Sequence, residues 1–247
     1  IVKTSGADTK LTLLADNNIS AADNIAIGAT TGKLNLDLLA GNTTNNASIT
    51  LGKFINISLN GGDFLAGAAN PDNAVSLTYS NNGQIHGGNV TLNLTRGLGG
   101  YAYKVQADND LTINGPVSGN TGWSIPLSFI AGGNLEMNSP TSISLNAAET
   151  TNGGGRVVIS GDKGVSLSTT DGDILLSAAS AATNSVNVSS VNGAVNVHAG
   201  EGNIDLSKGN ISAKGNITLK ADNGSITILG TNATATANIT SKAGNIS

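Results

Sequence analysis

Short runs of alternating apolar and polar residues recur along the chain. They include Val75–Tyr79, Val90–Leu94, Val195–Val197, Ile217–Leu219 and Ile226–Ile228, in which aliphatic residues alternate with Ser, Thr or Asn. A period of two residues is the pattern of a half-buried β-strand. No stretch keeps a period of 3.6 residues beyond a turn or two, so the pattern predicts an all-β fold.

The runs are separated by a recurring triplet of glycine, then Asn or Asp, then an aliphatic residue. It stands at residues 88–90, 133–135, 172–174, 202–204, 209–211, 215–217 and 244–246. Glycine, Asn and Asp tolerate a positive φ. Each triplet therefore predicts a tight corner that leads into a new strand.

A longer spacing distinguishes between the all-β folds. Expected strand starts form two series, Ile174, Val195, Ile217 and Ile239, and Val165, Val186, Ile204 and Ile226. Both series have a spacing of about 21 residues, which a sandwich of hairpins gives no reason to expect. We therefore predict a right-handed parallel β-helix over residues 1–247, with about 21 residues per coil and aliphatic side chains inside. About twelve coils at ~4.8 Å each would form a rod of roughly 55 Å.

One interval departs from the repeat. All seven aromatic residues and three of the four prolines lie between positions 54 and 129. We expect irregular loops outside the coil at approximately 61–130. Exposed Tyr and Trp offer flat apolar faces with a polar edge to a sugar or a protein. The candidate ligand-binding residues are thus Arg96, Tyr101, Tyr103 and Trp123, and the alternative is that the aromatic side chains fill the core.

Composition narrows the function classes. Charged residues are only 11% of the chain, its net charge is −4, and no basic cluster exists, so no nucleic-acid partner is expected. No apolar run approaches the ~18 residues of a membrane span. The chain has no cysteine, and it begins and ends inside the repeat pattern, as a segment of a longer protein would.

Catalytic and metal-binding patterns are weak. Asp108 and Asp110 form one carboxylate pair and Asp171 and Asp173 another, but both pairs lie in turn sequences without a basic neighbour. The two histidines, at positions 86 and 198, are far apart and lack acidic clusters. We therefore predict no catalytic residue, no metal site and no cofactor.

The motif Asn-x-Ser/Thr occurs more often than the roughly seven times expected by chance. The candidate glycosylation sites are Asn18, Asn42, Asn46, Asn56, Asn89, Asn93, Asn187, Asn210, Asn216, Asn223, Asn232, Asn238 and Asn245. Strand alternation is the alternative explanation, because Asn-Ile-Thr places two polar residues on the outer face of a strand.

Three stretches stand out among the repeats: residues 11–20 (LTLLADNNIS), residues 57–63 (ISLNGGD) and the closing Gly-Asn-Ile repeats. They resemble the exoproteins of two-partner secretion, a family that includes filamentous haemagglutinin and high-molecular-weight adhesins. The secretion domain of that family is not evident here, so the chain looks like part of the passenger shaft. The resemblance implies a β-helix, an outer-membrane transporter as export partner, and a place outside a Gram-negative cell. Some adhesins of this family carry hexoses on Asn-x-Ser/Thr, which is what the resemblance implies for the motifs above.

We thus expect a non-enzymatic adhesin segment, a rod that presents a binding region to a glycan or protein receptor on host cells or to other bacteria. The alternatives are a polysaccharide lyase or hydrolase built on a β-helix, and the stalk of a toxin-delivery or haem-acquisition exoprotein.

Overall fold

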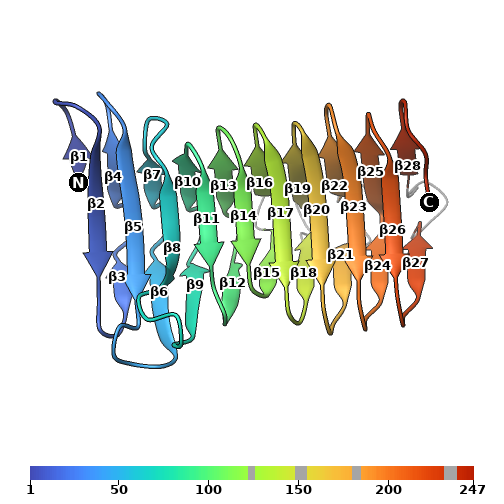
Figure 1. Cartoon of the computed structure of the whole chain (residues 1–247), viewed down its shortest axis with the longest axis horizontal. Helices are drawn as coiled ribbons and strands as arrows, with labels where there is room; N and C mark the ends of the chain where they lie inside the picture. Colours follow the sequence, from blue (N-terminus) through green and yellow to red (C-terminus); the bar gives the residue numbers. More distant parts are fainter. Residues whose placement is uncertain (122–125, 148–154, 180–184, 231–237) are drawn as a thin grey trace.

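Three parallel β-sheets wind around one core in the computed structural model of the chain (Figure 1). The structure describes residues 1–121, 126–147, 155–179, 185–230 and 238–247. All elements among these residues are strands, so the predicted all-β class is confirmed. Every strand pairing among them is parallel, with each strand hydrogen-bonded to its equivalents in the preceding and following coils.

Each sheet takes every third strand of the chain. Sheet A contains β1 (Val2–Lys3), β4 (Ala26–Ala29), β7 (Asn56–Ser58), β10 (Gln84–Gly87), β13 (Lys104–Ala107), β16 (Leu127–Ala131), β19 (Arg156–Gly161), β22 (Ser185–Ser190), β25 (Gly209–Ala213) and β28 (Asn238–Ser241). Sheet B contains β2 (Thr9–Leu14), β5 (Leu34–Ala40), β8 (Phe64–Ala68), β11 (Val90–Asn93), β14 (Leu111–Asn114), β17 (Asn134–Ser139), β20 (Gly164–Thr169), β23 (Ala194–Ala199) and β26 (Ile217–Ala221). Sheet C contains β3 (Ile19–Ala21), β6 (Ala47–Leu51), β9 (Val75–Tyr79), β12 (Gly97–Gly100), β15 (Val117–Asn120), β18 (Ile143–Ala147), β21 (Ile174–Ala178), β24 (Ile204–Ser207) and β27 (Ile226–Leu229).

Each coil passes through sheets B, C and A in that order. In Figure 1 the chain descends sheet B on the near side, turns at the lower edge into sheet C, and rises through sheet A. It then crosses over the top to the next coil, one step further to the right. This path makes the solenoid right-handed, as is usual for parallel crossover connections.

The length of a coil differs from the prediction. Register partners are closest in sequence at Leu98 and Val117 and farthest apart at Ile143 and Ile174, with coils roughly 28 residues apart for the solenoid as a whole. The expected uniform coil length and the twelve coils that follow from it are therefore wrong. Sheets of ten, nine and nine strands indicate a shorter rod of about 45 Å at ~4.8 Å per coil.

Inward-pointing aliphatic columns form a continuous core. Val195 and Ile217, predicted to point inward, are register partners in sheet B and are both fully buried. A fully buried aliphatic side chain stabilises a fold by about 1.5–3 kcal/mol relative to an exposed one. Since the same columns continue from coil to coil, the core runs along the rod.

The glycine triplets lie where strands begin, but for a reason other than the predicted one. Gly88 and Gly172 precede β11 and β21, and neither has a positive φ. A Cβ atom at Gly172 would lie 1.7 Å from the carbonyl oxygen of Thr141 in the preceding coil, and one at Gly88 would lie 2.4 Å from that of Gly61. Close approach of successive coils, not backbone conformation, therefore requires glycine at these corners.

The Asp or Asn of a corner bonds to the next coil. Asp63 Oδ1 accepts a hydrogen bond from the backbone N–H of Asn89 at 2.8 Å. In the same way, Asp110 Oδ1 binds the N–H of Asn134 and Asp173 Oδ1 binds that of Asn203, both at 2.7 Å. These side chains supply backbone hydrogen bonds at points where the sheet ladder is interrupted, and they align successive corners.

Candidate ligand-binding site at a corner of the solenoid

The four predicted binding residues do not form one site. Tyr103 is buried, with its hydroxyl 3.2 Å from the carbonyl oxygen of Ser118, to which it donates. Tyr101 is 43% exposed and Arg96 is exposed, but they lie at opposite ends of β12. Arg96 Nη1 donates to the carbonyl oxygen of Asn46 at 3.1 Å. Trp123 lies outside the described residues.

Most aromatic side chains of the interval belong to the core. The rings of Tyr79 and Tyr103 stack, and Phe129 meets Tyr103 edge to face with centroids 5.6 Å apart. Burial raises the pKa of both tyrosine hydroxyls above the usual value. The described part of residues 61–130 also contains the shortest coils, where Leu98 and Val117 form the one register pair between β12 and β15. The buried aromatic residues therefore accompany a change of coil length there. The alternative expectation, aromatic residues in the core, holds for Tyr103.

Phe54 is exposed, as Tyr101 is, and it stands at an unusual corner. Asn24, Phe54, Asn82 and Ala102 occupy the same position in four successive coils, just before a register column of sheet A. All four have positive φ, between 46° and 60°. Asn adopts this conformation readily, whereas a bulky side chain does so at a cost. Phe54 is nevertheless 55% exposed, so core packing does not compensate for the strain.

A pocket of about 560 Å³, which we call the corner pocket, opens beside Phe54. It is lined by residues from this corner and from the adjoining strands of sheet A. They are Phe54, Ile55, Asn56, Asn82, Gly83, Gln84, Ala102, Tyr103, Lys104, Pro126 and Ser128. Pro126 takes the place of Ala102 in the following coil, so the same position in four coils contributes to the lining.

The polar groups of the corner pocket are mostly uncharged. Gln84 Nε2 donates to Asn56 Oδ1 at 2.9 Å across two coils. Asn82 Oδ1 is buried and has no hydrogen-bond partner among the described residues. A buried acceptor without a partner costs about 1–3 kcal/mol, and a ligand donor or a water molecule would relieve that cost. Lys104 supplies the one charge of the described lining.

Sequence reasoning missed Phe54, Asn82, Gln84 and Lys104. A signal was nevertheless present, because residues 23–28 (DNIAIG) align with residues 53–58 (KFINIS) when the coils are matched strand by strand. This alignment places Phe54 where Asn24 stands. The coil length expected from the sequence is too short for these coils and therefore hides the alignment.

The carboxylate pairs have structural partners. Asp108 Oδ1 lies 2.7 Å from His86 Nε2, while Asp110 and Asp173 accept the corner hydrogen bonds described above. Asp171 lies in a turn, where its N–H donates to the carbonyl oxygen of Pro140. Among the described residues no group of three or more His, Cys, Asp or Glu side chains could hold a metal ion.

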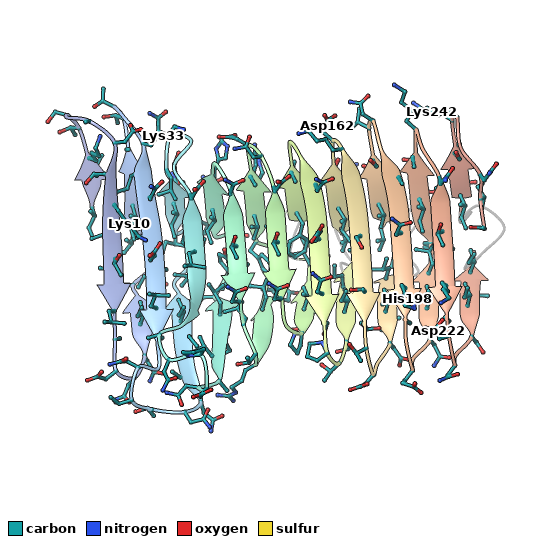
Figure 2. The ribbon with its side chains drawn as sticks, in the orientation of Figure 1. Lys10, Lys33, Asp162, His198, Asp222 and Lys242 are labelled. Atoms are coloured by element: carbon teal, nitrogen blue, oxygen red, sulfur yellow. The ribbon has the colours of Figure 1, made fainter. Side chains whose placement is uncertain are left out.

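The second histidine is also paired across coils. His198 of β23 and Asp222 after β26 lie side by side in Figure 2, with Nε2 and Oδ2 2.8 Å apart. Lys220 Nζ binds the other oxygen of Asp222 at 2.6 Å. The hydrogen bonds from Lys220 and His198 hold the pKa of Asp222 below its usual value.

The candidate glycosylation sites fall into two groups. Asn89, Asn187 and Asn210 are half-buried, and the Nδ2 atom of each donates to a neighbouring side chain. The second group, in exposed positions, comprises Asn18, Asn42, Asn46, Asn56, Asn93, Asn216, Asn223, Asn238 and Asn245. Asn232 lies outside the described residues.

Comparison with known proteins leaves the family open: no family model, no curated protein and no solved structure matches this chain. The part of the chain that the structure describes contains no helix long and apolar enough to cross a membrane.

Proposed function

We propose that the chain is a non-enzymatic segment of a bacterial surface adhesin, a rod that carries a ligand-binding region. The observation that supports this most is the corner pocket, in which a strained, exposed Phe54 stands near Asn82. The Oδ1 atom of Asn82 has no hydrogen-bond partner in the part of the chain that the structure describes. Strained residues concentrate where a structure binds or reacts. The described lining holds no carboxylate, so it lacks the carboxylate pair that a polysaccharide hydrolase uses, and binding fits it better than that chemistry.

The rest of the rod suits a shaft. Its core is continuous, and neighbouring coils are joined by hydrogen bonds between neutral side chains, such as Asn114 Nδ2 to Asn93 Oδ1 at 2.8 Å. In this proposal a two-partner transporter exports the protein, which then remains on the surface of a Gram-negative cell. That part rests on the resemblance of the repeats to the exoprotein family.

A cell-binding assay with the immobilised protein tests the proposal directly. Beads coated with the 247-residue protein are incubated with epithelial cells and with other bacteria, and bound cells are counted. We expect binding that the Phe54→Asn variant loses. Lys33→Gln, on the opposite corner between sheets A and B, is the matched surface control and should bind like the parent. Failure of the parent to bind any cell, or turnover of a polysaccharide by the purified chain, would contradict the proposal.

A further inference from the structure

We propose that the corner pocket binds an oligosaccharide through a carboxylated pyranose unit. This inference rests on the proposed binding function and names its ligand class. Three features of the pocket carry it: an apolar face, unpaired hydrogen-bonding capacity, and a single positive charge.

The apolar face is supplied by Phe54 and Pro126 at the two ends of the lining. They occupy equivalent positions three coils apart, which corresponds to roughly 14 Å along the rod. The flat face of an exposed aromatic ring can pack against the C–H face of a sugar ring. A lining of this length fits several linked sugars better than one.

The hydrogen-bonding groups suit sugar hydroxyls. Asn82 Oδ1 is an acceptor without a partner among the described residues, so a hydroxyl that donates to it would satisfy a buried polar atom. The bond from Gln84 to Asn56 fixes both amides and leaves the NH2 group of Asn56 as a donor. Fixed amides bind with a smaller loss of side-chain entropy than mobile ones.

The charge selects an acidic sugar. Lys104 is half-buried, and no salt bridge of the described residues includes it, unlike Lys10 with Asp37 and Lys220 with Asp222. No carboxylate lies in the described lining, although the chain has a net charge of −4. A half-buried lysine without a counter-ion among the described residues favours an anionic ligand. A carboxylate beside sugar hydroxyls matches both Lys104 and the neutral amides.

The probe is a hexuronate oligosaccharide, compared by calorimetry with the same oligosaccharide after reduction of its carboxyl groups to neutral alcohols. We expect the affinity of the acidic form to be at least about tenfold higher than that of the reduced form. Lys104→Gln should weaken binding of the acidic form by the same factor and leave the reduced form unchanged. Lys33→Gln should change neither. Phe54→Asn should weaken both, with an unchanged circular dichroism spectrum.

Equal affinities for the acidic and reduced forms, or full affinity in Phe54→Asn, would overturn the site assignment. Sialylated oligosaccharides are measured in the same way. If they bind more tightly than the hexuronate oligosaccharide, the acidic sugar that the pocket recognises is a sialic acid. Cell binding by the parent protein, together with no calorimetric binding of either acidic oligosaccharide, would overturn this inference and leave the proposed function standing. Cleavage of the bound oligosaccharide would instead support the site and contradict the non-enzymatic function.

Discussion

The rings of Tyr79 and Tyr103 stack inside the solenoid with centroids 4.6 Å apart and planes 7° from parallel. Both side chains are fully buried, and Tyr103 comes from the corner that also lines the pocket. The stack therefore links the core of the shortest coils to the wall of the corner pocket.

Tyr103→Ala should destabilise the chain by about 3–5 kcal/mol, because it removes a buried ring and leaves a cavity beside Tyr79. Denaturant unfolding followed by circular dichroism measures the change. Tyr101→Ala, which removes a 43% exposed ring from the same corner, is the control and should cost less than about 1 kcal/mol. Equal losses in the two variants would show that Tyr103 does not pack as described.

Gly83→Ala should also destabilise the fold, because a Cβ atom there would lie 2.5 Å from Tyr79 Cδ1 and 3.0 Å from Ile55 Cγ2. Overpacking of this kind costs about 1–3 kcal/mol. The control is Gly99→Ala in β12, where the nearest atom is the Ser118 hydroxyl oxygen at 3.3 Å. The melting temperature of Gly83→Ala should be clearly lower than that of Gly99→Ala. The reverse order would argue against the position of the Tyr79 ring described above.

Phe54→Asn should separate stability from binding. Asn24 and Asn82 occupy the same left-handed position in neighbouring coils, so Asn at position 54 relieves the strain of a bulky residue. We expect a gain of about 1 kcal/mol in unfolding free energy. Ligand binding should be lost in the same protein. A variant that is less stable than the parent would mean that Phe54 contributes to the fold more than to recognition.

The pairs that Asp222 forms with Lys220 and His198 predict a dependence of stability on pH. The pKa of Asp222 is lowered in the folded state, so its carboxylate stabilises the fold above the unfolded pKa of about 4. That contribution is lost as the pH falls through the lowered folded-state pKa. Asp222→Asn should therefore be less stable than the parent at pH 6, and the two should converge in strong acid.

Urea midpoints measured from pH 6 downward test this dependence. Asp171→Asn is the control, because Asp171 takes part in no salt bridge of the described residues. The urea midpoint of this variant should change with pH in parallel with that of the parent. A constant offset between Asp222→Asn and the parent at every pH would exclude the ion pairs as the cause.

Glycosylation is testable on protein from the native organism. We expect hexoses at exposed motifs such as Asn46 and Asn245, and none at Asn187 or Asn210, whose half-buried Nδ2 atoms donate within sheet A. Mass spectrometry of proteolytic peptides locates the added mass. Protein from a laboratory host without the transferase supplies the unmodified reference. Peptides with bare masses throughout would reject the modification, and hexose at Asn210 would contradict the expected protection of half-buried motifs.

The fold class could be predicted from alternation and corner residues, but the coil length could not. Ile174, Val195 and Ile239 lie in sheets C, B and A, so their even spacing compares strands that never pair. With three similar strands per coil, a step of two strands and a step of three strands along the chain give nearly equal spacings, as from Ile174 in β21 to Val195 in β23 and on to Ile217 in β26. Register becomes visible only when hydrogen-bonded partners are known, as for Val195 and Ile217.

The corner pocket, which we propose as a binding site, was not predicted as such. Aromatic clustering pointed to the interval in which it lies, but the clustering could not separate Tyr103, which packs inward, from Phe54, which points out. That difference depends on which coil position each ring occupies. Asn82 could not be predicted at all, since its importance comes from a buried oxygen without a partner among the described residues.

The coils differ in length, from the short one between Leu98 and Val117 to the long one between Ile143 and Ile174, yet the register of each sheet is kept from one end of the rod to the other. Extra residues must therefore enter at the corners, where they leave the stacked columns untouched. Such a scaffold tolerates insertion: a corner can gain or lose a peptide without refolding its neighbours. Natural variation in corner length, and the grafting of foreign peptides by design, would both draw on the same freedom.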